Sequence, residues 1–164
     1  MTERMNFYSF SDYGWHKGFY TDGDPTVPLQ KIYYTDFFED LNDDEFPFDT
    51  AYPLLCGSCN HFTVSLAKVL GYTPYIIEAN SNKGFHAFCQ VYKKQKWYYI
   101  DARGVTSSFN EFMDIAKTFV KDEYIIRPVN PEDIEEWEKD FNYNEEAYAF
   151  AEAIIEKYKE CYIV

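Results

Sequence analysis

Hydrophobic and polar positions in the middle of the chain follow two different periods. From residue 58 to residue 70 the apolar residues recur at helical spacing, and Gly71 suits a C-terminal cap, so we predict a helix over 58–70. Later segments rich in aromatic and β-branched residues are typical of strands. We predict strands over residues 75–79, 85–92, 97–102 and 124–129.

Helical patterns return toward the C-terminus. Ser108 and Glu111 form a capping box that predicts a helix to about residue 119. Asn130-Pro131 predicts the start of another helix, with Pro in the first turn and acidic residues after it. A last helix is predicted over 145–160, and its inner face comprises Tyr148, Ala151, Ile154, Ile155 and Tyr158.

These elements predict an α+β fold in one domain over residues 1–164, in which a helix packs on an antiparallel sheet and further helices follow at the C-terminal end. Residues 1–50 show no sustained period, and we interpret them as an irregular, acidic, aromatic-rich lobe with a short helix near 34–41. Residues 51–129 form the core that carries the candidate chemistry. Residues 130–164 form an acidic helical segment.

Charge narrows the functional classes. The net charge is −13, and residues 1–50 and 130–164 each carry eleven acids against three Lys or Arg, whereas residues 51–129 carry six acids against nine. With this balance of charge we do not expect the chain to bind nucleic acid through its phosphates, and the acidic ends would suit a basic protein partner.

No apolar run approaches the roughly 18 to 20 residues of a membrane span, and the N-terminus lacks the apolar region of a signal peptide. We therefore expect a cytoplasmic protein whose four cysteines are reduced.

Cys59 is the predicted nucleophile. It falls in the first turn of the predicted helix, where unpaired N–H groups and the macrodipole favour a thiolate. Cys56 precedes that helix and gains less from its field. His61 lies about 200° around the helix from Cys59, so it is a poor candidate for the base.

His86 and Asp101 are the predicted partners of this cysteine. A symmetric hairpin that pairs Lys93 with Lys96 places Phe88 opposite Asp101, so His86 and Asp101 share a face, one diagonal step apart. A one-residue bulge would break this relation. Without a bulge, the carboxylate can orient one imidazole nitrogen while the other addresses the cysteine. The order cysteine, histidine, aspartate is what a nucleophile, its base and the base's orienter require.

Three segments of the chain resemble a known core. They are Gly57-Ser-Cys-Asn-His-Phe-Thr-Val-Ser-Leu-Ala-Lys-Val-Leu-Gly71, then His86-Ala-Phe, and then Trp97-Tyr-Tyr-Ile-Asp101. Over residues 57–104 the sequence is similar to the core of the transglutaminase-like, papain-like cysteine hydrolase superfamily.

The resemblance implies a Cys-His-Asp triad, with Cys59 as nucleophile, His86 as general base and acid, and Asp101 as orienter. It implies a hydrolase or acyl transferase that attacks an amide or ester bond and forms a thioester. The substrate would be a peptide, a protein or an amide-containing small molecule, and neither a metal nor an organic cofactor is implied. Peptidases, amidases, acyl transferases and inactive binding modules all occur in this superfamily, so the resemblance leaves the reaction open.

Three alternatives stay open at this point. Cys56-x-x-Cys59 and His86-x-x-Cys89 have zinc-ligand residue types, although His86 and Cys89 should point to opposite faces of a strand. Cys56-Gly-Ser-Cys59 before a helix is similar to a thiol–disulfide exchange motif, without the usual βαβ context. The acidic ends and an aromatic content of 21% would also suit a non-catalytic interaction or inhibitor protein on an inherited papain-like scaffold.

Overall fold

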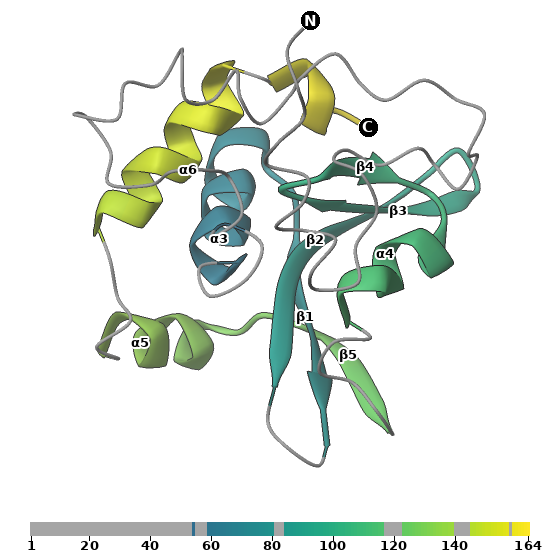
Figure 1. Cartoon of the computed structure of the whole chain (residues 1–164), viewed down its shortest axis with the longest axis horizontal. Helices are drawn as coiled ribbons and strands as arrows, with labels where there is room; N and C mark the ends of the chain where they lie inside the picture. The colour runs from purple at the N-terminus through teal and green to yellow at the C-terminus, as the bar shows by residue number, and fades with distance from the viewer. Residues whose placement is uncertain (1–53, 55–58, 81–83, 117–122, 140–144, 158) are drawn as a thin grey trace, which may run out of the picture.

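The computed structural model of the chain describes residues 54, 59–80, 84–116, 123–139, 145–157 and 159–164. Its elements are, in order, α3 (Cys59–Leu70), β1 (Pro74–Ala79), β2 (Phe85–Lys93), β3 (Lys96–Asp101), β4 (Gly104–Thr106), α4 (Phe109–Ala116), β5 (Tyr124–Pro128), α5 (Pro131–Lys139), α6 (Glu145–Lys157) and the 3-10 helix η2 (Lys159–Tyr162) (Figure 1). The predicted lobe over residues 1–50, its short helix near 34–41, and Cys56 lie outside the described residues.

The strands form one sheet in the order β4-β3-β2-β1-β5. Each pair of neighbours is antiparallel. The four predicted strands are present within one residue at each end, whereas the three-residue β4 was not predicted. The α+β class and the antiparallel sheet are therefore confirmed.

Local sequence signals explain where the helices begin and end. Gly71 ends α3 with a φ of 74°, and its N–H donates to the Ala67 carbonyl at 3.0 Å, as in a left-handed cap. The Ser108 hydroxyl accepts the Glu111 N–H at 3.2 Å at the start of α4. The Asn130 side chain accepts the Asp133 N–H at 3.0 Å at the start of α5. The predicted end of the α4 helix near residue 119 lies outside the described residues.

The β2–β3 hairpin has the predicted register. Lys93 pairs with Lys96, and the two residues between them, Lys94 and Gln95, have φ values of 53° and 68°. Positive φ at both central residues is what a two-residue type I′ turn requires. Cys89 faces Ile100, so no bulge shifts the paired residues between the turn and that point.

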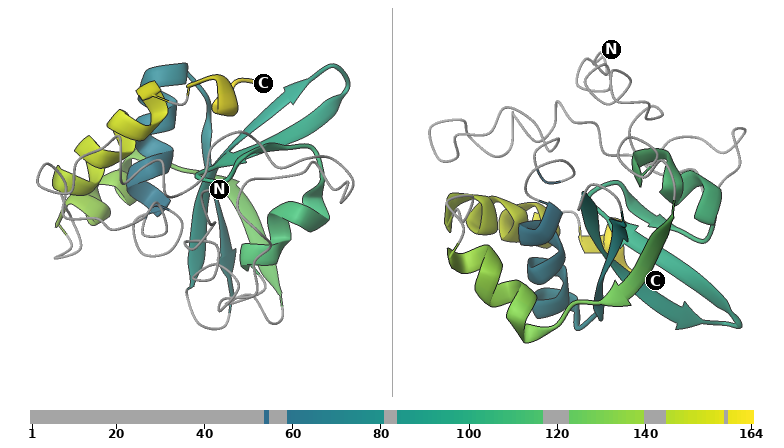
Figure 2. Two further views of the ribbon diagram at one scale, coloured as in Figure 1. Left: turned by 45° about the horizontal axis from the view of Figure 1, so that its top comes forward. Right: turned by 90° about the horizontal axis from the view of Figure 1, so that it is seen from below.

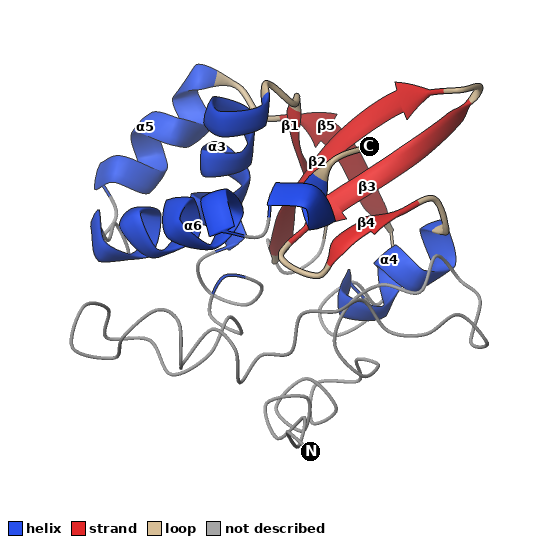
Figure 3. Cartoon of the chain, turned by 90° about the horizontal axis from the view of Figure 1, so that it is seen from above, coloured by secondary structure: helices blue, strands red, loops and turns tan. Residues whose placement is uncertain are grey.

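Helices cover both faces of the sheet (Figures 1 and 2). On one face α3 and α6 lie side by side, joined to the C-terminal η2 (Figure 3). Their buried core comprises Leu54, Phe62, Leu66, Cys89, Ile100, Ala102, Phe150, Ala151, Ile154, Ile155 and Tyr162. On the other face α4 contributes Phe112 to a second core with Ile77 and Phe88. Alternate residues of β2 therefore enter different cores, as the strand period requires.

The C-terminal segment departs from its prediction in detail. The single helix predicted over 145–160 is α6, which ends at Lys157, followed by η2 from Lys159. The buried residues of α6 include the predicted Ala151, Ile154 and Ile155, together with Ala147 and Phe150, whereas Tyr148 is half-buried and Tyr158 lies outside the described residues.

Tyr162 then fastens this segment to the sheet. Its hydroxyl donates to the Ala102 carbonyl at 3.1 Å, and its own carbonyl accepts the Tyr72 hydroxyl at 2.8 Å. The turn that follows Asp101 is therefore held from the C-terminal side. In the described part of the chain, no helix combines the length and apolar character that crossing a bilayer requires.

Candidate active site

Cys59 is the first residue of α3, and its side chain is buried, with 6% exposed. Its Sγ accepts a hydrogen bond from the Ala87 backbone N–H at 3.4 Å. The Gln90 N–H donates toward β1, to Thr73, and N–H directions alternate along a strand, so the Ala87 N–H points to the β3 side. The hairpin register would place Ala102 opposite Ala87, but β3 ends one residue earlier. The sulfur therefore takes a donor that the sheet leaves available where β3 stops.

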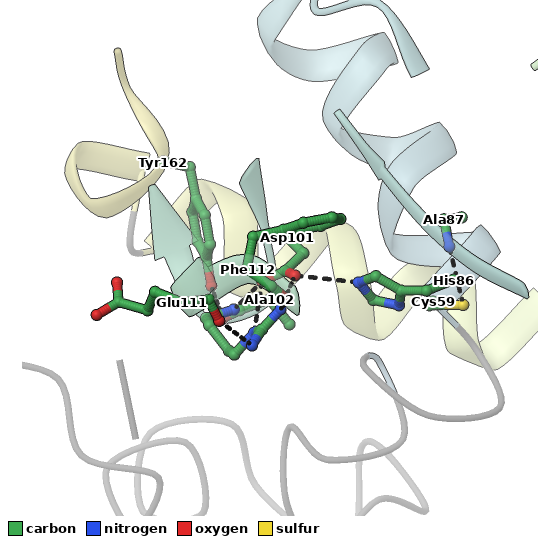
Figure 4. A network of polar contacts seen from close by, with 9 residues as sticks. Cys59, His86, Ala87, Asp101, Ala102, Glu111, Phe112 and Tyr162 are labelled. Carbon is green, nitrogen blue, oxygen red and sulfur yellow. Dashed lines mark hydrogen bonds and ion pairs between the residues drawn. The ribbon is translucent and has the colours of Figure 1, made fainter. Parts of the chain in front are cut away.

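His86 and Asp101 lie next to each other, as their predicted diagonal relation requires. His86 Nε2 and Asp101 Oδ2 are 3.0 Å apart, and both residues are 1% exposed. Figure 4 shows the imidazole between Asp101 and Cys59, with the ring side that carries Nδ1 turned toward the sulfur. The structure thus brings together the three residues that the sequence singled out.

Apolar side chains enclose this group. The rings of Phe88 and Phe112 lie 6.4 Å and 6.0 Å from the His86 ring, measured between centroids. Cys59 packs with the buried Ile76 and Ala87, and the half-buried Phe85, Val129 and Trp137 complete this cluster. Because His86 and Asp101 are almost fully buried, the electrostatic interaction between them is stronger than in water.

Arg103 is a member of the site that the sequence did not reveal. It is 4% exposed, and its Nη2 lies 2.7 Å from Asp101 Oδ2 while its Nε lies 3.2 Å from Oδ1. Its backbone N–H also donates to Oδ1 at 3.0 Å. Burial alone would raise the pKa of Asp101, but the charge of Arg103 and the hydrogen bond from His86 outweigh it. The pKa of Asp101 therefore lies well below its usual range.

A local signal could have indicated this contact. The pair Asp101–Gly104 closes the two-residue β3–β4 turn, and Gly104 has a φ of 108°. An Asp at such a position commonly accepts the N–H two residues later, which here is that of Arg103. That the arginine side chain folds back onto the same carboxylate depends on α4, and the sequence does not show this.

His61 and Cys89 have other partners. His61 is buried, its Nδ1 lies 3.0 Å from Asn60 Oδ1, and its ring meets Tyr148 of α6 edge-on. The His61 ring therefore lies against α6, and that it is a poor candidate for the base stays a prediction. Cys89 lies in the α3 core and directs its thiol to the Thr63 carbonyl at 3.7 Å. Burial, with a contribution from the Asp101 charge, raises the pKa of this thiol, so it is held neutral.

The zinc alternative is weakened by the same placement. His86 contacts Asp101 beside the α4 core, whereas Cys89 belongs to the α3 core, so the two side chains lie on opposite faces of β2. Among the described residues no three His, Cys, Asp or Glu side chains come together as a metal site would require. Cys56, which both the zinc and the disulfide-exchange alternatives need, lies outside those residues.

A scan of protein-family models, a search of curated proteins and a search of solved structures each find no match for this chain. The candidate site is therefore defined by its own geometry.

Proposed function

We propose that this chain is a cysteine-dependent hydrolase or acyl transferase of the papain-like or transglutaminase-like type. The observation that carries the proposal is the position of His86. It binds a buried carboxylate at 3.0 Å through one ring nitrogen and turns the other side of its ring toward a cysteine at a helix N-terminus. Nucleophile, base and orienter meet in this arrangement.

Proton transfer follows from the tautomer of His86. An ionised Asp101 only accepts hydrogen bonds, so a neutral His86 carries its proton on Nε2, and Nδ1 is left as the acceptor. Nδ1 takes the proton from Cys59 Sγ, and the thiolate attacks the carbonyl carbon of the substrate. The bond from that carbon to the leaving nitrogen or oxygen then breaks, and His86 gives its proton to the leaving group. A thioester on Cys59 remains, which water or an amine resolves.

Three local features favour this chemistry at Cys59. The N-terminus of α3 stabilises negative charge on the sulfur. The Ala87 N–H, at 3.4 Å from Sγ, adds a hydrogen-bond donor to that charge. In the proposed reaction the Cys59 backbone N–H, in the first turn of α3, donates to the developing oxyanion. The substrate class is a peptide, a protein or a small amide or ester.

Acylation by an activated ester tests the proposal without knowledge of the natural substrate. We expect p-nitrophenyl acetate to acylate Cys59 in a rapid first turnover and to leave a thioester that hydroxylamine removes. Peptide mapping by mass spectrometry locates the acetyl group. Cys161, a half-buried thiol in η2 that packs against the α3 core, serves as the internal reference. Acetylation of Cys56 or Cys161 ahead of Cys59 would contradict the assignment of the nucleophile.

A further inference from the structure

The Arg103 guanidinium group forms hydrogen bonds both to the Asp101 carboxylate and to backbone carbonyls of α4. Two of its nitrogens hold the two oxygens of Asp101, at 2.7 Å and 3.2 Å. The outer nitrogens also donate to backbone carbonyls of α4, with Nη1 at 3.4 Å from the Glu111 oxygen and Nη2 at 3.1 Å from the Phe112 oxygen. Figure 4 shows that the Glu111 carboxylate points away from Asp101 and His86, so this residue takes part through its backbone oxygen. A lysine could not reproduce this planar fork.

The contacts leave Asp101 one orientation. Its two oxygens accept from the Arg103 backbone N–H, from two side-chain nitrogens of Arg103 and from His86 Nε2. These four contacts take up the acceptor sites of a carboxylate, which number about four. Rotation of the carboxylate away from His86 would therefore break contacts to Arg103.

The α4 contacts reach the imidazole by a second route. Phe112, whose carbonyl accepts from Arg103, is fully buried, and its ring lies 6.0 Å from the His86 ring. Arg103 thus binds α4, whose Phe112 ring packs near the His86 ring. It also binds the Asp101 carboxylate, which fixes the tautomer of His86.

We propose that Arg103 is a positioning residue of the catalytic site, which acts on Cys59 through Asp101 and His86. This inference rests on the proposed function. Arg103 touches neither the sulfur nor the substrate in this scheme. Its role is to hold the Asp101 carboxylate ionised and correctly oriented, so that Nδ1 of His86 stays available for the thiol proton.

Removal of Arg103 changes the protonation of the site in a definite direction. Burial is the largest influence on Asp101 and raises its pKa, so loss of the guanidinium charge lets this carboxyl take up a proton at a higher pH. A protonated Asp101 donates to His86 Nε2, which moves the imidazole proton to Nδ1 and blocks that nitrogen as a base. Among the described residues, the other titratable groups around Asp101 are His86 and Cys89 of β2, with Cys59 of α3 beyond the imidazole. The Tyr162 hydroxyl lies on the other side, bound to the Ala102 carbonyl.

The experiment compares iodoacetamide alkylation of Cys59 between pH 5 and pH 9 in the wild type and in Arg103→Gln, Arg103→Lys and Arg127→Gln. Arg127 is the matched control, because it forms a similar fork with Asp133, at 2.8 Å and 2.9 Å. Its other hydrogen bonds go to Glu78 and Pro128. We expect Arg103→Gln to slow alkylation at neutral pH by about 10- to 100-fold and to shift the acid limb of the profile toward neutral pH by about one unit. Arg103→Lys keeps the charge but loses the fork, so it should be about tenfold slower with an unshifted acid limb. Arg127→Gln should overlay the wild type.

Two outcomes overturn the inference. One is an Arg103→Gln profile with the wild-type acid limb. The other is a Cys59 alkylation rate in Arg103→Lys equal to that of the wild type. This second outcome decides the question if Arg103→Gln does not fold. The proposed function fails separately if wild-type Cys59 reacts no faster than Cys161. In that case ¹⁵N NMR of the His86 ring still decides the role of Arg103, because an unchanged tautomer in the arginine variants would exclude it.

Discussion

Replacement of Cys59 by Ala is expected to abolish acyl transfer, with a loss on the order of 10⁴-fold or more, because no other described side chain in the site can form the thioester. The fold should persist. The substitution removes one sulfur atom that is 6% exposed, and it leaves the Ala87 N–H without this acceptor, which costs about 1 to 3 kcal/mol. Turnover of p-nitrophenyl acetate, with urea unfolding of the same samples, measures both effects.

Cys161→Ala is the matched control, since it removes a half-buried thiol outside the site and should leave turnover unchanged. A Cys59→Ala protein that keeps full biological effect would contradict catalysis. It would favour the non-catalytic interaction protein instead, in which exposed acids such as Glu135, Glu136 and Glu138 of α5 meet a basic partner.

Replacement of Asp101 by Asn should have the second large effect, this time on stability as well as activity. Asn keeps the shape but leaves the Arg103 guanidinium, 4% exposed, without its counter-charge. Removal of one partner from a buried ion pair costs about 3 to 5 kcal/mol in the free energy of unfolding. Urea denaturation checks this value, and the double variant Asp101→Asn with Arg103→Met should recover much of the loss. An Asp101→Asn protein as stable as the wild type would show that the Asp101–Arg103 ion pair does not contribute this much to the free energy of unfolding.

The pH dependence of unfolding gives a companion measurement. The pKa of Asp101 is depressed in the folded protein, so its stabilising contribution is present above the unfolded value of about 3.9 and is lost as the pH falls toward the folded value. The wild type should therefore lose stability steadily below about pH 4. Asp101→Asn should lack that part of the acid slope.

The parts of the site that were predictable from sequence depend on regular geometry. A two-residue turn between Lys93 and Lys96 fixes the hairpin register, and the strand period then places His86 and Asp101 on one face. The helix period and the cap at Gly71 likewise set where α3 lies along the chain and put Cys59 in its first turn. Local periodicity therefore sufficed to place Cys59 in the first turn of α3 and His86 beside Asp101.

The parts that were missed depend on tertiary contacts. β4 has only three residues, too few to show a strand period. The Ala87 N–H becomes a donor to the Cys59 sulfur only because β3 ends early, which is a property of the folded sheet. From the sequence, Arg103 is expected to be a turn residue. Its burial follows from the packing of α4 over the turn. For the same reason, the sequence alone gives no sign that Asp101→Asn would leave a buried arginine without its counter-charge and so destabilise the fold.

The role of Cys59 as nucleophile is tested most directly by the rate at which each cysteine of the wild-type chain reacts with iodoacetamide at neutral pH, where ordinary thiols are mostly protonated. Mass spectrometry separates the four positions, and His86→Gln serves as the comparison. We expect Cys59 to react fastest despite its burial, and we expect the His86 substitution to remove this advantage. A faster reaction at Cys56, or a Cys59 rate that His86→Gln leaves unchanged, would contradict this role.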